Sequence, residues 1–281
     1  MKRLLVCTDG SAYGQVCCQY AGWLAARSEA VVEILYVTDL RQFEVPLIAD
    51  LSGSMGIQPY QAILGQLQEL EEKKAAIILE NAVKTVREAG ATGEVLSAHK
   101  TGLLVDCLTD HEVEADLILL GKRGENANFA TEHLGSTMER VVRASTLPCL
   151  VTSRSFKPVS RALIAYDGGE SSGKIIEFLA NSDSFRGLEI QVVTVAGSID
   201  ADTALGHLRE AEARLKDAGY NPVCQMLHGT AEDQIAAYVA GNAINLLMMG
   251  AYGHSRIRYL IIGSTTTEMI RTCRIPVMLF R

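Results

Sequence analysis

Two stretches of this sequence share one pattern, and that repetition constrains the fold more than any other feature. Residues 246–271 and residues 117–143 each run from a short apolar segment into a glycine, a second glycine three positions later, and then a Gly-Ser-Thr triplet that opens a helical pattern. An internal repeat of this kind predicts two copies of one structural unit. Each copy is typical of a strand, a glycine loop and a helix N-terminus.

The repeated pattern indicates an anion-binding turn. Glycines let the backbone approach a ligand closely, and the free N–H groups at a helix start attract anions. The second copy has nine residues between Gly253 and Gly263, whereas the first has ten between Gly124 and Gly135. Neither spacing fits the Walker loop or the dinucleotide fingerprint, so those two phosphate-binding mechanisms are excluded.

Length and composition fit two globular domains. The 281 residues are 48% hydrophobic and 21% charged, which is ordinary for chains with real cores. Lys157-Pro158 marks the predicted boundary, with domains at residues 1–156 and 157–281. The net charge of −7 argues against nucleic acid or an anionic membrane surface as the main partner.

The sequence favours a cytoplasmic protein. No signal peptide is expected at the N-terminus, and no apolar run approaches the ~18 residues of a membrane span. The seven cysteines include no CxxC pair and no metal-ligand spacing. Cys7, Cys149 and Cys273 lie in or beside apolar runs, so we expect them to be small buried apolar residues in a reducing compartment.

Apolar runs alternate with helical patterns along the whole chain. In the first half, strands are predicted at residues 3–8, 31–37, 95–98, 115–120 and 148–153, and helices at 11–30, 61–88, 103–111 and 136–143. In the second half, strands are predicted at 161–166, 188–195, 223–227, 244–249 and 275–280, and helices at 202–218, 232–240 and from 264 onward. This alternation predicts doubly wound, mostly parallel sheets with both faces covered.

The first half holds the longest predicted helix, residues 61–88, after a long connection at residues 39–60. A connection of that length is typical of functional lids or mobile segments. The periodicity of the helix predicts an inner apolar face made of Leu64, Leu67, Leu70, Ile77, Ile78, Val83 and Val86.

An aspartate follows the first strand of each half, Asp9 in one and Asp167 in the other. In doubly wound sheets, ligands bind outside the carboxyl ends of the strands, where the strand order reverses. If strands one and four are neighbours there, each aspartate meets the glycine loop of its own half. Its carboxylate could accept hydrogen bonds from an adenine or a ribose, while the loop and the Ser264/Thr265 helix start hold phosphates. A simple helix N-cap is the alternative role for both aspartates.

These motifs resemble the universal stress protein family in its tandem form, over nearly the whole chain. Four residues match the family's G-x2-G-x9-G-[S/T] ATP-binding signature in full: Gly250, Gly253, Gly263 and Ser264. The resemblance implies that Asp167 reads adenine, that Val195 lines the base pocket, and that Met249 holds the position before the first glycine, as in ATP-binding members. Thr265 and Arg256 complete the expected ATP site.

The resemblance also implies a fold. Each half is expected to be a five-stranded parallel sheet of order 3-2-1-4-5 flanked by helices, and the two halves are expected to pair through their last strands. It further implies a cytoplasmic location and a role in the stress response.

The first half keeps much of the pattern and departs from it in the loop. Its residues give a second candidate ATP site made of Asp9, Val37, Gly121, Gly124, Gly135, Ser136 and Thr137. The loop carries Glu125 and Glu132, whereas the second half has Arg256 and Arg258. Because a carboxylate near a triphosphate weakens binding and an arginine strengthens it, we expect ATP mainly in the C-terminal half.

The sequence therefore predicts a stress protein in which ATP, with or without Mg²⁺, biases conformation or association as a switch. No catalytic residue and no protein-held metal is assigned, because no base, metal carboxylate and charge clamp are grouped beside the glycine loop. A slow ATP hydrolase and an ATP-independent interaction protein stay open as alternatives. Protein partners are unassigned, and the chain is expected to be a monomer with an internal pseudo-dimer or a homodimer.

Overall fold

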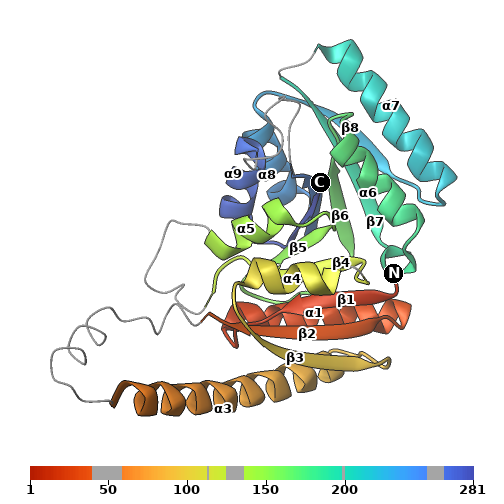
Figure 1. Cartoon of the computed structure of the whole chain (residues 1–281). Helices are drawn as coiled ribbons and strands as arrows, with labels where there is room; N and C mark the ends of the chain where they lie inside the picture. Colours follow the sequence, from red (N-terminus) through yellow and green to blue (C-terminus); the bar gives the residue numbers. More distant parts are fainter. Residues whose placement is uncertain (40–58, 113, 125–135, 198–199, 252–262) are drawn as a thin grey trace.

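The computed structural model describes residues 1–39, 59–112, 114–124, 136–197, 200–251 and 263–281 (Figure 1). The elements of the first half are β1 (Arg3–Cys7), α1 (Ala12–Ser28), β2 (Val31–Thr38), α3 (Pro59–Glu88), β3 (Val95–Thr101), α4 (Leu104–Glu112), β4 (Leu117–Gly121), α5 (Ser136–Ala144) and β5 (Cys149–Thr152). Those of the second half are β6 (Arg161–Ala165), α6 (Glu170–Ala180), the short 3₁₀ helix η3 (Asp183–Phe185), β7 (Glu189–Ala196), α7 (Ala201–Asp217), β8 (Val223–His228), α8 (Ala231–Gly241), β9 (Leu246–Gly250), α9 (Ser264–Thr272) and β10 (Val277–Phe280).

The strands form one sheet of order β3-β2-β1-β4-β5-β10-β9-β6-β7-β8, which runs from β3 at the bottom of Figure 1 to β8 at the top. Within each half the strands are parallel and follow the order 3-2-1-4-5. The halves meet at β5 and β10, which pair antiparallel with Leu150 opposite Met278. The expected fold and the expected pairing through the last strands are therefore confirmed.

Helices cover both faces of this sheet in two layers. Alternate residues of a strand point to opposite faces, so Leu4 and Val6 pack into one core while Leu5 and Cys7 pack into the other. The first core takes its helical side chains from α1, α3, α6 and α7, and the second takes them from α4, α5, α8 and α9. Strands covered on both faces explain the nearly continuous apolar runs in the sequence.

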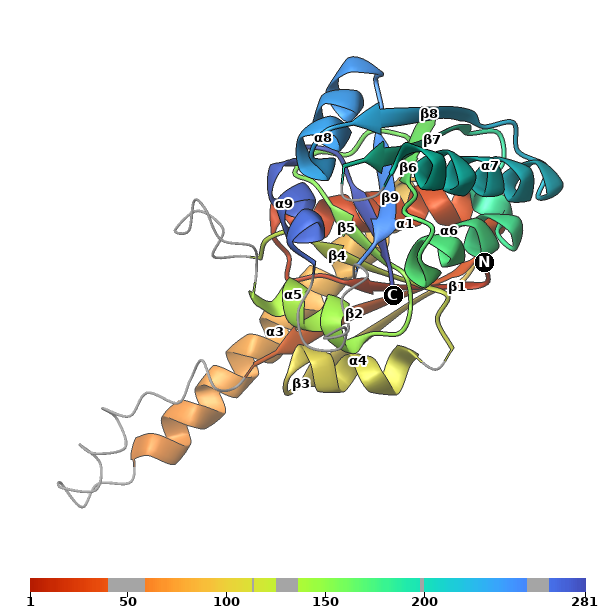
Figure 2. The same ribbon diagram turned by 90° about the horizontal axis from the view of Figure 1, so that it is seen from above.

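The long helix α3 corrects one expectation. Leu70 and Ile77 were predicted on its inner face, but each is 60% exposed, whereas Val86 is fully buried. At 30 residues, α3 is about 45 Å long by its helical rise. Its N-terminal part therefore extends beyond the sheet, as Figure 2 shows. Helical periodicity places residues on one stripe, but it does not say where the surface opposite that stripe ends.

The two halves also cap each other's helices. Lys122, which directly follows β4, donates from Nζ to the carbonyl oxygens of Arg271 (2.7 Å) and Cys273 (3.2 Å) at the C-terminus of α9. Arg281, after β10, donates to the Arg143 carbonyl (2.9 Å) at the C-terminus of α5. A cation at a helix C-terminus satisfies unpaired carbonyls and complements the helix dipole. Each cap crosses the junction, so the halves stabilise one another outside the sheet as well.

All seven cysteines are free thiols, and Cys7, Cys149 and Cys273 are buried as expected. Among the helices in the described residues, none is long and apolar enough to cross a membrane.

Candidate functional site

The site expected in the second half lies where three strands end side by side. β6 lies between β7 and β9, so the residues that follow β6 lie between the ends of those two strands. Asp167 comes two residues after β6, Val195 is the next-to-last residue of β7, and Gly250 is the last residue of β9. The neighbourhood on which the binding prediction depends is therefore present.

Asp167 shapes the turn between β6 and α6. Its Oδ1 accepts hydrogen bonds from the Gly169 N–H (2.9 Å) and from the Ser172 hydroxyl (2.6 Å). The residue that caps α6 is Gly169, so the alternative role of Asp167 as an N-cap is wrong. The bond from an aspartate to the N–H two residues on is an Asx-turn. The exposed side chain stands on the solvent side of this turn.

Helix α7 packs against the same turn through His207. Gly168 has a φ of +75°, and a Cβ built there would lie 2.5 Å from the His207 ring. Only glycine combines this left-handed backbone with such close packing. His207 lies about forty residues from the turn that it covers, so no local sequence signal connects it with the site.

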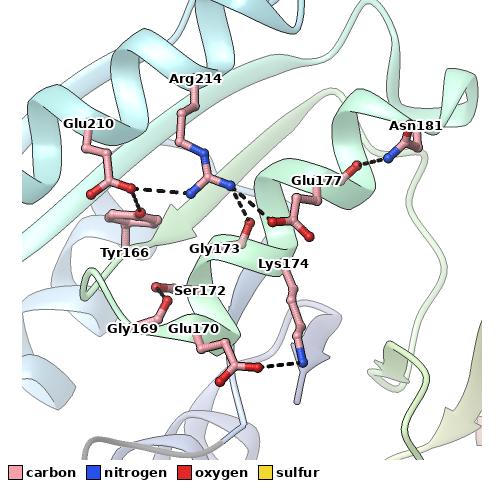
Figure 3. Close-up of polar contacts among 10 residues, drawn as sticks. All are labelled: Tyr166, Gly169, Glu170, Ser172, Gly173, Lys174, Glu177, Asn181, Glu210 and Arg214. Carbon is pink, nitrogen blue, oxygen red and sulfur yellow. Dashed lines mark hydrogen bonds and ion pairs between the residues drawn. The ribbon is translucent and has the colours of Figure 1, made fainter.

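A polar network fastens α7 to the start of the second half (Figure 3). Glu210 accepts from the Tyr166 hydroxyl (3.0 Å) and from Arg214 (3.3 Å), and Arg214 reaches Glu177 on α6 (3.3 Å). Burial, together with the hydrogen bond to Glu210, raises the pKa of Tyr166 to about 12. The residue directly before Asp167 is thus fixed by contacts to α7.

The glycine motif of the second half lies partly within the described residues. Met249 is buried at the end of β9, and a Cβ built on Gly250 would come 3.1 Å from the Ser171 Cβ. Gly263 is the N-cap of α9 and makes no side-chain capping bond, while Ser264 is exposed as the first residue of the helix. Gly253 and Arg256 lie outside the described residues. Helix α9 begins at the edge of the sheet where the motif predicts phosphate, and N–H groups at a helix start favour anions.

One acidic residue at this helix start was missed from the sequence. Thr265 donates from its hydroxyl to the Glu232 carboxylate, with 2.5 Å between Oγ1 and Oε1. Glu232 belongs to the first turn of α8, and α8 begins at the same edge of the sheet because it follows β8. The signal available in the sequence was its position three residues after Gly229, but nothing in the motif connects that position with α9.

The first half brings the corresponding residues together. Asp9 accepts from the Ser11 N–H (3.0 Å), and Ser11, not Asp9, caps α1. A Cβ built on Gly124 would lie 3.0 Å from Asp9 Oδ2, so the aspartate and the glycine loop are adjacent.

Other expected residues of that half are placed in part. Val37 is on β2, Gly121 ends β4, and Ser136 and Thr137 open α5. Gly135, Glu125 and Glu132 lie outside the described residues, as do most of the connection at 39–60 and the second-half Arg258.

A cavity of about 420 Å³ lies between the Asp9 turn and α3. Its lining combines apolar side chains with two lysines: Leu70, Lys73, Lys74, Ile77 and Ile78 from α3, and Asp9, Gly10 and Ser11 from the turn. Gly10 has a φ of +79°, and a Cβ built there would lie 2.9 Å from Ile78. Ile78 therefore packs on Gly10 as His207 packs on Gly168.

In the part of the chain that the structure describes, no group of three or more His, Cys, Asp or Glu side chains is placed to hold a metal ion.

Comparison with known proteins agrees with this architecture. The model of the universal stress protein family matches residues 1–153 and again residues 158–281. A universal stress protein of Synechocystis sp. is 44% identical over 288 residues, covering all of both chains, and one of Mycobacterium tuberculosis is 24% identical over 79% of this chain and 81% of its own. The crystal structure of a universal stress protein from Archaeoglobus fulgidus has a TM-score of 0.74 at 22% identity, covering 99% of this chain and 96% of that one. The chain belongs to the universal stress protein family and carries two copies of its domain.

Proposed function

We propose that this protein binds an adenine nucleotide, mainly in its C-terminal half, and acts in the stress response as a nucleotide-biased switch. The observation that carries the proposal is that the Asp167 turn and the β9–α9 motif lie at the same edge of the sheet. Helix α9 begins there at Gly263, with no side-chain cap on its first N–H groups. A helix start of this kind favours the negative charge of phosphate.

The family resemblance, together with these positions, supports the following roles. Asp167 and Val195 stand beside the base and ribose, while Gly250, Gly263, Ser264 and Thr265 face the phosphates. Met249 lies under the ligand as the last side chain of β9. Gly253 and Arg256 belong to the same motif by sequence. We expect the protein to act in the cytoplasm, where its seven free thiols would stay reduced.

We expect a switch rather than an enzyme, because the sequence groups no base, metal carboxylate and charge clamp beside the glycine loop. Phosphoryl transfer needs a placed base, a metal and a charge clamp beside the phosphates. We therefore expect any ATP turnover to stay below about 1 s⁻¹, the slow end of the range for dedicated enzymes. A faster rate would favour the hydrolase alternative.

The first experiment counts nucleotides on the purified protein by native mass spectrometry and identifies them after acid extraction. One adenine nucleotide per chain is the expected result, and two would show that the first half also binds. None, even with ATP and Mg²⁺ added, would favour the ATP-independent interaction protein.

Gly263→Val then assigns the site. A valine side chain at the α9 N-cap would hold the phosphate away from the backbone, so we expect ATP binding to be lost in calorimetry while the fold persists. Gly206→Val is the matched control, because Gly206 lies on α7 with nothing within 4 Å of a Cβ built on it. Equal ATP affinity in Gly263→Val and the control would refute the site.

A further inference from the structure

The N-terminus of α9 already has a negative charge beside it, and that charge comes from another helix. α9 has no acidic residue in its own first turn and no side-chain cap at Gly263. The carboxylate of Glu232 brings an acidic group to this helix start, since it accepts a hydrogen bond from the Thr265 hydroxyl (2.5 Å). An anion near a helix start is stabilised by the helix dipole and by the unpaired N–H groups. Glu232 itself belongs to the first turn of α8.

The first half has a different residue at the position that corresponds to Glu232. Gly102 and Gly229 both have a positive φ and each lies two residues before a helix, α4 or α8. Counting three residues on from these glycines reaches Val105 in the first half and Glu232 in the second. A glutamate at this position is therefore found only in the half whose glycine motif is complete, while α5 of the first half has Glu139 in its own first turn.

We infer that Glu232 is an internal anion at the start of α9, which the phosphates of a bound nucleotide must displace. This inference rests on the proposed function and concerns the regulation of the same site. Phosphate would need the hydrogen bond from the Thr265 hydroxyl that the Glu232 carboxylate now accepts. The phosphate and the carboxylate would also repel each other at short range. Glu232 thus lowers affinity for the nucleotide and stabilises the empty site.

A divalent cation bound to the nucleotide reduces this conflict. Mg²⁺ neutralises phosphate charge, so the repulsion between the nucleotide and Glu232 becomes weaker. Nucleotide binding should therefore depend on Mg²⁺ more strongly in the wild-type protein than in a variant without the carboxylate.

The test is Glu232→Gln, which keeps an oxygen for Thr265 and removes the charge. We expect the variant to bind ATP about tenfold more tightly than wild type in calorimetry without Mg²⁺, and the gain to shrink with Mg²⁺. The ligand-free variant should melt at a lower temperature, because α9 has lost its anion. Tighter binding together with a lower melting temperature is a combination that a purely structural role would not produce.

Asp233→Asn is the matched control. Asp233 lies in the same turn of α8 and accepts a hydrogen bond from the Thr230 hydroxyl (2.6 Å), not from α9. The substitution therefore removes an equal charge without changing a contact to α9. We expect its ATP affinity to equal that of wild type. Glu232→Val is a second variant, in which valine replaces glutamate as at the corresponding position 105 of the first half. We expect it to bind ATP more tightly than wild type as well.

The outcomes separate the two proposals. If wild type binds ATP and Gly263→Val does not, but Glu232→Gln and Glu232→Val bind no more tightly than wild type, the role of Glu232 is refuted and the proposed function stands. An equal gain in Asp233→Asn would also refute it, because net charge alone would then explain the effect. If neither wild type nor the Glu232 variants bind any adenine nucleotide, both proposals fall.

Discussion

The two halves of this protein share one strand order and differ in the side chains around the carboxyl edge of the sheet. Ile78 covers the glycine after Asp9, whereas His207 covers the glycine after Asp167. Val105 is the residue that corresponds in sequence to Glu232, whose carboxylate bonds to α9. The backbone devices, a positive-φ glycine and an Asx-turn at each aspartate, are the same in both halves. Backbone geometry therefore keeps the framework the same in both halves, while single side chains set the chemistry of each edge.

The largest expected effect is on stability, and it tests whether the two halves share one core where β5 pairs with β10. Leu150 and Met278 face each other across β5 and β10, and both are buried. Leu150→Ala and Met278→Ala should each lower the free energy of unfolding by about 2–5 kcal/mol, because each leaves a cavity. Urea unfolding measures the loss, and the double variant should lose less than the sum since the residues are in one pair. Strict additivity would contradict a shared core.

The second prediction compares the two aspartate turns. Gly168→Ala should cost about 2–3 kcal/mol, since alanine is strained at positive φ and its Cβ would also meet the His207 ring. Gly10→Ala should cost about 1–2 kcal/mol, because alanine is strained at the φ of +79° and its Cβ would meet only one aliphatic side chain, with Ile78 Cγ1 at 2.9 Å. Thermal unfolding of both variants gives the comparison. A larger loss at Gly10 would show that Ile78 packs more rigidly than His207.

The third prediction concerns alkaline pH. Burial raises the pKa of Cys18 and of Cys149 to about 12, from an unfolded value of 9.0. The unfolded state therefore loses these protons first as pH rises, so the stability they contribute is complete below pH 9 and declines between pH 9 and about 12. Each thiol should contribute a decline of roughly 1.4 kcal/mol per pH unit in that range.

Cys149→Ala removes one of these thiols. We expect its unfolding free energy, measured in urea from pH 8 to pH 11, to fall less steeply than that of wild type. Burial also raises the pKa of Cys7 and Cys17 in the first half, and that of Cys224 in the second half to about 11, so these thiols add to the slope that remains in the variant. A pH slope identical to that of wild type would show that Cys149 does not contribute.

The smallest expected effects come from the crossed helix caps. Lys122→Met and Arg281→Met should each cost about 1 kcal/mol, because each removes a cation from a helix C-terminus. Amide hydrogen exchange should show Lys122→Met loosening α9 and Arg281→Met loosening α5, each in the opposite half. Changes confined to the half that carries the substitution would contradict the capping role.

The sequence predicted the strands and the layer order well, because alternating apolar runs, glycine turns and an internal repeat are local or periodic signals. It failed at Leu70 and Ile77, where α3 continues past the sheet that its apolar stripe would cover. It also missed His207 and Glu232, since each reaches the site from a helix that the motif does not include. The caps made by Lys122 and Arg281 could not be predicted either, because they depend on how the halves meet.

The antiparallel contact between β5 and β10 has a consequence for how such a chain evolves. Two separate subunits that paired through their last strands could form homodimers. Every substitution in such a homodimer would be present on both sides of the strand pairing. Covalent linkage of the halves fixes one copy of each on either side of the joint. The first half therefore always pairs with the second half of the same chain. One half can keep a complete glycine motif while the other accumulates changes.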